Sequence, residues 1–159
     1  MSKEIQQNKG NSALIIRPLV ADDRSQWESL WREYLAFYET ELPPKVYDST
    51  FSRMLSGKDS EFHCKLAVLD GRPVGLVHYL FHRHGWSIEN TCYLQDLYAD
   101  PSVRGTGVGR ALIEAVYKAA DEHGATSTYW NTQDFNKTAR VLYDRIAQLT
   151  PFLKYVRRK

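Results

Sequence analysis

The residues most suited to chemistry form a glycine-rich run, Arg104–Arg110, which reads RGTGVGR. The run lies between a predicted strand and the start of a predicted helix. Glycines in such a loop allow positive φ and a close approach of the backbone to a ligand. Free N–H groups and the helix dipole then favour an anion, typically a phosphate or pyrophosphate. The alternative is that the glycines only form the entry to the helix.

Two familiar nucleotide loops do not fit this run. A P-loop requires Lys-Ser or Lys-Thr after its last glycine, and neither pair is present. A dinucleotide-binding loop requires G-x-G-x-x-G and an acidic residue at the end of the next strand. Here the spacing is G-x-G-x-G, and the next predicted strand ends at Asn131. Both nucleotide-binding interpretations therefore fail.

The elements around the loop predict a mixed α/β domain. Apolar periodicity and turn residues indicate strands over Ser12–Pro18, Phe62–Leu69, Val74–Phe81, Thr91–Ala99, Thr126–Asn131 and Pro151–Arg157. They indicate helices from an Asp22 or Asp23 cap to Tyr38, from Val46 to Leu55, from Val108 to His123, and from an Asn136 cap past Tyr143. Asp70-Gly71 predicts a hairpin turn. We expect three antiparallel strands followed by a crossover from 91–99 to 126–131.

Composition limits the class of protein. The chain has 159 residues, with 43% hydrophobic, 25% charged and a net charge of +2. We expect a flexible tail over 1–11 and one domain over 12–159. The small net charge argues against nucleic-acid binding, and no apolar run is long enough to span a membrane. The polar start and the two unpatterned cysteines favour a reduced, cytoplasmic protein.

The run R-x-x-G-x-G, Arg104 to Gly109, resembles the coenzyme A pyrophosphate loop of the GNAT N-acetyltransferase superfamily. The preceding Tyr93–Ala99 with Asp100-Pro101, and the N-x-x-A-x-x-L-Y pattern of Asn136–Tyr143, are similar to that superfamily as well. The resemblance covers about residues 12–159. Within the superfamily, Leu94–Ala99 and Tyr129–Thr132 resemble the yeast histone/polyamine/D-amino-acid acetyltransferase branch.

This resemblance implies a mostly antiparallel GNAT-like sheet with helices on both faces. It also implies a cleft where the strand before the loop splays from the next strand. Acetyl-CoA would be the cosubstrate, and no metal would be needed. The residues that would bind it are the strand end Leu97, Tyr98 and Ala99, the loop Arg104, Gly105, Thr106, Gly107, Val108, Gly109 and Arg110, and Asn136. For Asn136 the alternative is helix capping alone.

Tyr143 is the leading catalytic candidate. A phenol with a pKa of about 10 stays protonated at neutral pH and can donate a proton to a departing sulfur. The resemblance places the general acid at this position. The alternative is a core aromatic residue, because Tyr143 shares a helix face with Ala139 and Ile146.

The general base is less well defined by the sequence. A primary amine with a pKa of about 10.4 costs about 4.6 kcal/mol to deprotonate at pH 7. Some relatives carry Glu where this chain has Gln95, which cannot be a base. Asp96 is a candidate, although strand alternation points it to the opposite face, where a structural role is the alternative. Glu39, Glu41 and Glu89 are candidates by position only.

The segment that joins the first two helices would form one wall of the acceptor site, together with Gln95. It carries Tyr38, Glu39, Glu41, Tyr47 and Asp48, which suit a small cationic amine if they are not merely exposed. We expect direct acetyl transfer to a polyamine or amino acid in a ternary complex. Protein or histone lysine acetylation and a non-catalytic acyl-CoA-binding regulatory module are the alternatives.

Three further expectations concern metals, assembly and the aromatic residues. His78, His82 and His84 lack a completing carboxylate or cysteine, so we expect no metal. We expect a homodimer, although the family's Gly turn after Tyr143 is missing. We assign Trp27, Trp31, Tyr34 and Tyr38 to the core, and the cleft aromatics are Tyr93, Tyr98, Tyr129, Trp130 and Tyr143.

Overall fold

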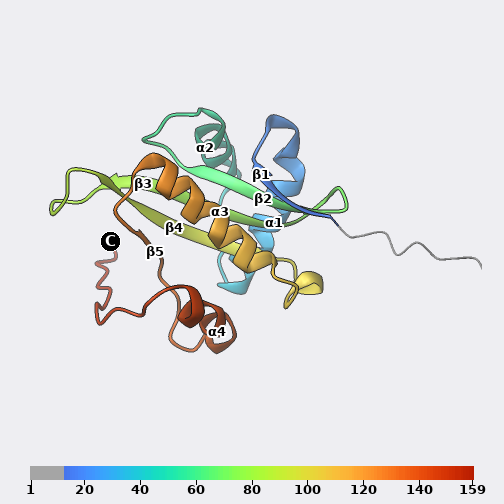
Figure 1. The fold of residues 1–159 in the computed structure, drawn as a ribbon. Coiled ribbons are helices and arrows are strands. Elements are labelled where there is room, and N and C mark those ends of the chain that lie inside the picture. Colours follow the sequence, from blue (N-terminus) through green and yellow to red (C-terminus); the bar gives the residue numbers. More distant parts are fainter. Residues whose placement is uncertain (1–12) are drawn as a thin grey trace, which may run out of the picture.

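Five strands form one sheet in the order β1-β2-β3-β4-β5 (Figure 1). The computed structural model describes residues 13–159, so the predicted tail over 1–11 lies outside the described residues. Neighbouring strands are antiparallel except β4 and β5, which are parallel. The predicted mixed, mostly antiparallel sheet is therefore confirmed. The strands are β1 (Leu14–Pro18), β2 (His63–Leu69), β3 (Arg72–Arg83), β4 (Asn90–Ala99) and β5 (Thr128–Tyr129).

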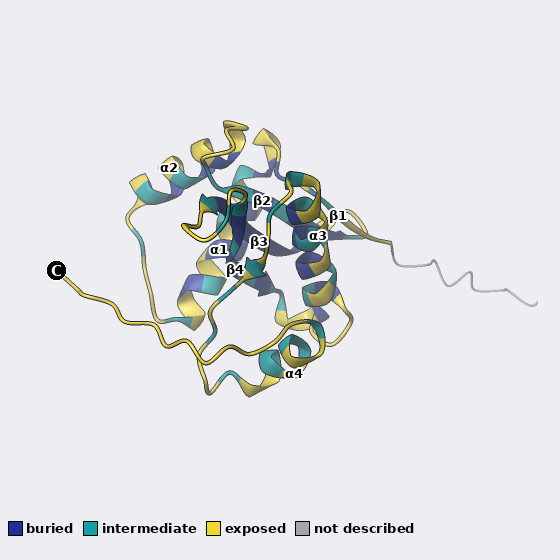
Figure 2. Ribbon diagram, turned by 60° about the vertical axis from the view of Figure 1, so that its left-hand side comes forward, coloured by how far each residue is buried: buried dark blue, intermediate teal, exposed yellow. Residues whose placement is uncertain are grey.

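Helices cover both faces of this sheet, as expected. Helices α1 (Arg24–Phe37) and α2 (Pro44–Leu55) pack on one face, where Trp27 of α1 is fully buried. Helix α3 (Val108–His123) packs on the other face through Leu112, Ile113 and Val116. Helix α4 (Lys137–Ile146) lies beyond β5 and buries no residue fully. The two cores meet at the strands, which are the most buried part of the ribbon (Figure 2).

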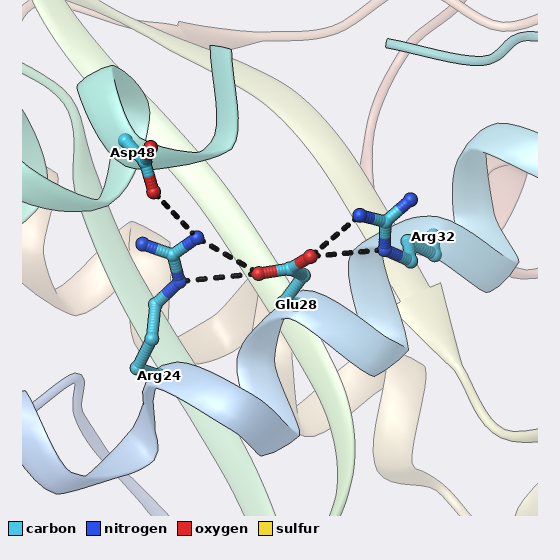
Figure 3. A network of polar contacts seen from close by, with 4 residues as sticks. All are labelled: Arg24, Glu28, Arg32 and Asp48. Atoms are coloured by element: carbon cyan, nitrogen blue, oxygen red, sulfur yellow. Dashed lines mark hydrogen bonds and ion pairs between the residues drawn. The ribbon is translucent and has the colours of Figure 1, made fainter. Parts of the chain in front are cut away.

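A charged network attaches α2 to α1 (Figure 3). The carboxylate of Glu28 accepts hydrogen bonds from Arg24 at 2.8 Å and from Arg32 at 2.6 Å. Arg24 also pairs with Asp48 of α2 at 2.9 Å, and the Arg32 guanidinium lies 4.2 Å from the ring centroid of Tyr47. Ion pairs as exposed as these contribute about 0.2–1 kcal/mol each to stability. The apolar packing beneath them therefore contributes most of the free energy that holds α2 on α1.

Strand β4 contains a bulge at Gln95. His78 of β3 pairs with Asp96, and Tyr79 pairs with Leu94, so Gln95 has no partner residue on β3. Before the bulge, Cys92 and Leu94 belong to the core under α3. After it, Tyr98 belongs to the core under α1, and Asp96 is bonded to α1. A one-residue insertion of this kind reverses which face each later side chain occupies.

Strands β4 and β5 separate soon after they meet. Their pairing consists of Cys92 with Thr128 and Tyr93 with Tyr129. Strand β5 is thus shorter than the predicted Thr126–Asn131, because the chain turns away toward α4. The expected splay between these two strands is confirmed.

One local prediction holds only in part, and another is wrong. Asp23 is the N-cap residue of α1, as predicted, but its side chain makes no capping hydrogen bond to that helix. Its carboxylate instead binds Arg17 at 2.7 and 2.8 Å and accepts the Val20 N–H at 2.9 Å, which ties β1 to α1. The predicted strand over 151–157 does not form, and the segment after α4 is exposed (Figure 2). A strand needs a partner edge, and this segment pairs with none among the described residues.

Among residues 13–159, no helix combines the length and apolar character that a membrane span requires.

Candidate active site

A small cleft opens where β4 and β5 diverge. Four parts of the chain line it: α1, β4, the segment after β5, and α4. The cleft therefore brings together four of the predicted site residues, Tyr38, Gln95, Leu97 and Tyr143. The lining residues that the sequence did not single out for this site are Tyr34, Leu94, Asn131 and Thr132. Trp130, predicted as a cleft aromatic, lies there too.

The glycine loop has the geometry of an anion site. Gly105 and Gly107 have φ values of 78° and 91°, so the predicted positive φ is confirmed at both. Gly107 is the N-cap of the 16-residue helix α3. Within the described residues, no acceptor binds the N–H groups of Gly105, Gly107, Val108, Gly109 and Arg110. Such amides and the helix dipole together suit a pyrophosphate.

Not every residue of the predicted loop has a backbone N–H that is free to bind an anion. The N–H of Thr106 donates to the Val103 carbonyl at 3.3 Å, and its hydroxyl donates to the same oxygen. Arg104 and Arg110 are exposed at the two ends of the loop. Arg104 donates to the Ala99 carbonyl at 3.3 Å, and Arg110 pairs with Glu114 at 2.7 Å. Thr106 therefore stabilises the loop, while both guanidiniums add positive charge beside it.

Tyr143 has a free hydroxyl at the cleft. Its ring meets Trp130 edge-on with centroids 5.3 Å apart, which fixes the ring in the wall. Within residues 13–159, no hydrogen bond engages its hydroxyl group. Burial, and then the nearby Tyr38, raises the pKa of this phenol to about 12. The group therefore keeps its proton at neutral pH and can donate it.

Other predicted residues lie at the edge of the cleft or outside it. Asn136 is the N-cap residue of α4, as predicted, but its side chain makes no capping hydrogen bond, and its amide instead donates to the Thr132 hydroxyl at 3.4 Å. The Tyr98 side chain is buried on the α1 face and donates to Glu33, so only its backbone can serve a ligand. Glu39 and Glu41 are exposed and line no part of the cleft. Glu89 is exposed in the β3–β4 connection.

Asp96 lies behind the cleft wall and is only 6% exposed. Its Oδ2 contacts Trp31 Nε1 at 3.1 Å and His78 Nδ1 at 2.9 Å. His82 lies elsewhere, 2.8 Å from the Tyr129 hydroxyl. Across the described part of the chain, no three potential ligand side chains gather around a common point for a metal ion.

Tyr34 was assigned to the core from its periodicity on α1. Its ring centroid is 5.0 Å from that of Tyr38, one turn further along the helix, and both rings line the cleft. The only indication in the sequence that Tyr34 lines the cleft was its position four residues before Tyr38, near the end of an otherwise apolar helix face. Tyr93 and Tyr129 stack with centroids 4.9 Å apart, outside the cleft lining.

Comparisons with known proteins agree with this geometry. Residues 26–147 match the Acetyltransferase (GNAT) family. The D-amino-acid N-acetyltransferase HPA3 of Saccharomyces cerevisiae is 35% identical over 158 residues, 99% of this chain and 98% of that protein. The thialysine N-epsilon-acetyltransferase of Bos taurus is 32% identical over 138 residues, 82% of this chain and 81% of that protein.

Solved structures show the same fold at lower identity. The aminoglycoside N-acetyltransferase AAC(6')-Iy in complex with CoA is 18% identical, with a TM-score of 0.81 over 94% of this chain and 97% of that chain. The family match, the two relatives above 30% identity and the shared fold lead to one conclusion: the chain belongs to the GNAT acetyltransferase family and is an N-acetyltransferase.

Proposed function

We propose that this enzyme moves the acetyl group of acetyl-CoA to the primary amine of a small molecule, an amino acid or a polyamine. The cleft between β4, α1 and α4, with the free Tyr143 hydroxyl in its wall, carries this proposal. Two neighbouring aromatic rings, Tyr34 and Tyr38, line this small cleft, which suits a small acceptor better than a protein chain. The relatives named for D-amino acids and for thialysine support an amino acid first.

The residues of the chain fit acetyl-CoA, which supplies an acetyl thioester when bound. The unpaired amides of Gly105 and 107–110 would bind the pyrophosphate. Beyond Tyr93, the edge of β4 that faces β5 has no partner strand among residues 13–159, so Leu97 to Ala99 can bind an extended pantetheine arm. The half-buried side-chain amide of Asn136 would form a further hydrogen bond with the pantetheine arm.

Direct attack by the amine is supported by the absence of a suitable nucleophile in the described residues. Both cysteines, Cys64 and Cys92, are buried. Burial raises the pKa of Cys64 well above its usual value and that of Cys92 to about 11, so neither thiol forms a thiolate at neutral pH. The amine would therefore attack with both substrates bound, while Tyr143 gives its proton to the departing sulfur.

We also propose a homodimer that forms through the segment after α4. Five large apolar side chains in this segment are 66–92% exposed: Leu149, Phe152, Leu153, Tyr155 and Val156. A cavity of about 1130 Å³ lies between the segment, α4 and the short edge strand β5. Exposed apolar side chains beside an open strand edge typically mark an interface. The proposed occupant of this cavity is the same segment of a second copy.

The function is tested by thiol release from acetyl-CoA with polyamines, L- and D-amino acids and a histone-tail peptide. We expect release with an amino acid or a polyamine and little with the peptide. Release with the peptide alone would contradict the small-amine proposal. No release with any acceptor would contradict acetyl transfer itself.

Replacing Gly107 tests the pyrophosphate site. In Gly107→Ala the new side chain meets no neighbour, but a φ of 91° costs a non-glycine residue about 1–2 kcal/mol. We expect the KM for acetyl-CoA to rise roughly tenfold as the loop relaxes. Gly57→Ala is the matched control, because Gly57 has a φ of 67° in open space after α2. Equal loss of affinity in both variants would remove the site from this loop.

Replacing Tyr143 tests the general acid. Tyr143→Phe keeps the ring that contacts Trp130, so we expect kcat to fall about 10²-fold with the KM for acetyl-CoA nearly unchanged. Because the pKa of Tyr143 is about 12, the wild-type rate should not decline below about pH 11 through loss of this proton. Tyr47→Phe, a buried phenol outside the cleft, is the control. An unchanged kcat in Tyr143→Phe would rule out the assignment.

Light scattering tests the dimer. We expect the wild-type chain to have twice its monomer mass at micromolar concentration. Deletion of 149–159, or the double substitution Phe152→Asp and Tyr155→Asp, should yield monomers because it removes or charges the apolar contact. Arg157→Ala with Arg158→Ala is the control and should stay dimeric. A monomeric wild-type chain would refute the proposed interface.

A further inference from the structure

A buried cluster of polar side chains lies where α1 packs on the bulge of β4. The polar cluster consists of Trp27 and Trp31 from α1, His78 from β3 and Asp96 from β4, and each is at most 6% exposed. The Trp27 indole nitrogen lies 2.9 Å from His78 Nε2. His78 Nδ1 lies 2.9 Å from Asp96 Oδ2, and the Trp31 indole donates to the same oxygen at 3.1 Å. Hydrogen bonds therefore join one helix to two strands inside the core.

The positions of the protons in the polar cluster follow from Trp27. Its indole N–H can only donate, so His78 Nε2 must be the acceptor and carries no proton. The ring proton of His78 is therefore on Nδ1 and is donated to Asp96. Every N–H group of the cluster then has an acceptor. A buried network that is fully satisfied in this way holds one arrangement rigidly.

The helix side of the polar cluster continues into one wall of the cleft. Trp27, Trp31, Tyr34 and Tyr38 follow one another at i, i+4, i+7 and i+11, so they share a face of the helix. The two tryptophans are hydrogen-bonded to the sheet, and the two tyrosines line the cleft. Because a helix turns as one body, the orientation that is fixed at the tryptophans also sets the direction of the tyrosines.

The strand side of the polar cluster continues into the opposite wall. His78 and Asp96 are paired across β3 and β4 at the bulge, and Gln95 is the residue without a partner. Gln95 and Leu97, on either side of Asp96, both line the cleft. A slip of one residue would move each of these side chains to the other face. The hydrogen bonds that Asp96 accepts from Trp31 and His78 therefore hold the bulge in the register that presents Gln95 to the cleft.

Apolar packing alone would fix this geometry less well. The side chains that surround the two tryptophans are mostly apolar, and hydrophobic contact has no preferred direction. A helix held only by such contacts can shift or rotate slightly on the sheet at little cost. A hydrogen bond weakens steeply when its angle departs from linear, so the indole bonds resist both movements.

We propose that the four residues of the polar cluster are positioning residues for the acceptor amine. They set the spacing between the α1 wall and the β4 wall, and so determine how closely the amine is held beside the thioester. They act through Tyr34, Tyr38 and Gln95, which line the cleft, whereas the cluster itself lies behind the lining. This inference rests on the proposed function, because it assigns the acceptor to that cleft.

Two substitutions of Asp96 test the positioning role. Asp96→Leu removes the acceptor, whereas Asp96→Asn keeps one oxygen for both donors and loses only the charge. In Asp96→Leu we expect kcat/KM for the amine to fall about 10²-fold, because the reacting groups are misplaced. The KM for acetyl-CoA should stay unchanged, since α3 and its loop belong to the opposite core. Asp96→Asn should remain close to the wild type, and an equal loss in both variants would overturn the inference.

Asp23→Leu is the matched control. Asp23 is a buried carboxylate, 4% exposed, that joins the start of α1 to β1 through Arg17, away from the cleft. Both leucine variants should have a lower Tm, but only Asp96→Leu should lose kcat/KM for the amine. A purely structural role for Asp96 predicts the same kinetics in both variants, which would refute the positioning role. If Asp96→Leu does not fold, Trp31→Phe decides, because it removes only the indole donor, and wild-type kinetics in it would be equally contrary.

Nitrogen NMR of the wild-type protein tests the polar cluster without any substrate. We expect His78 to be the neutral tautomer with its proton on Nδ1, and the Trp27 indole N–H to be protected from exchange. A proton on Nε2 of His78 would overturn the cluster whatever the activity of the enzyme. A wild-type chain that acetylates no amine would instead refute the proposed function, so the two failures are distinguishable.

Discussion

The bulge at Gln95 is the constraint on which the site depends. Strand β4 has to serve an apolar core under α3 and a partly polar layer under α1. With regular alternation, Asp96 would share a face with Cys92 and Leu94 and would bury its charge among the side chains of the α3 core. The extra residue opposite His78 and Tyr79 turns Asp96 toward α1 instead, where two N–H donors meet it.

The same position explains where the cleft begins. Pairing of β4 with β5 ends at Tyr93, two residues before the bulge, so distortion on one edge of the strand coincides with separation on the other. Beyond this point β4 runs on to the loop before α3, whose unpaired amides lie at the helix N-terminus. Sheet pairing, cleft and anion site therefore follow one another along a single stretch of about fifteen residues.

Much of this architecture could be predicted from the sequence, because periodicity, turn residues and the glycine loop are local properties. The bulge could not be predicted, because the apolar and polar residues from Leu94 to Tyr98 do not alternate regularly. The sequence therefore does not indicate which face of the sheet each of these side chains occupies. Tyr34 was assigned to the core because periodicity cannot distinguish a core side chain from a cleft wall. Glu39 and Glu41 were predicted from their place in the chain, yet the loop turns them to solvent. The strand over 151–157 failed because strand formation depends on a partner edge, which a single sequence does not reveal.

The two cleft phenols show how burial prepares a tyrosine to keep its proton. Burial raises the pKa of both Tyr34 and Tyr143, so both are protonated at neutral pH. They differ in the elements that hold them. Tyr34 lies on α1 with its ring centroid 5.0 Å from that of Tyr38, whereas Tyr143 lies on α4 with its ring edge-on to Trp130. The Tyr143 hydroxyl has no acceptor among the described residues, so its proton is free for a group in the cleft. Because Trp130 fixes the ring while the hydroxyl stays unbonded, Tyr143 is suited to supply a proton to the leaving sulfur.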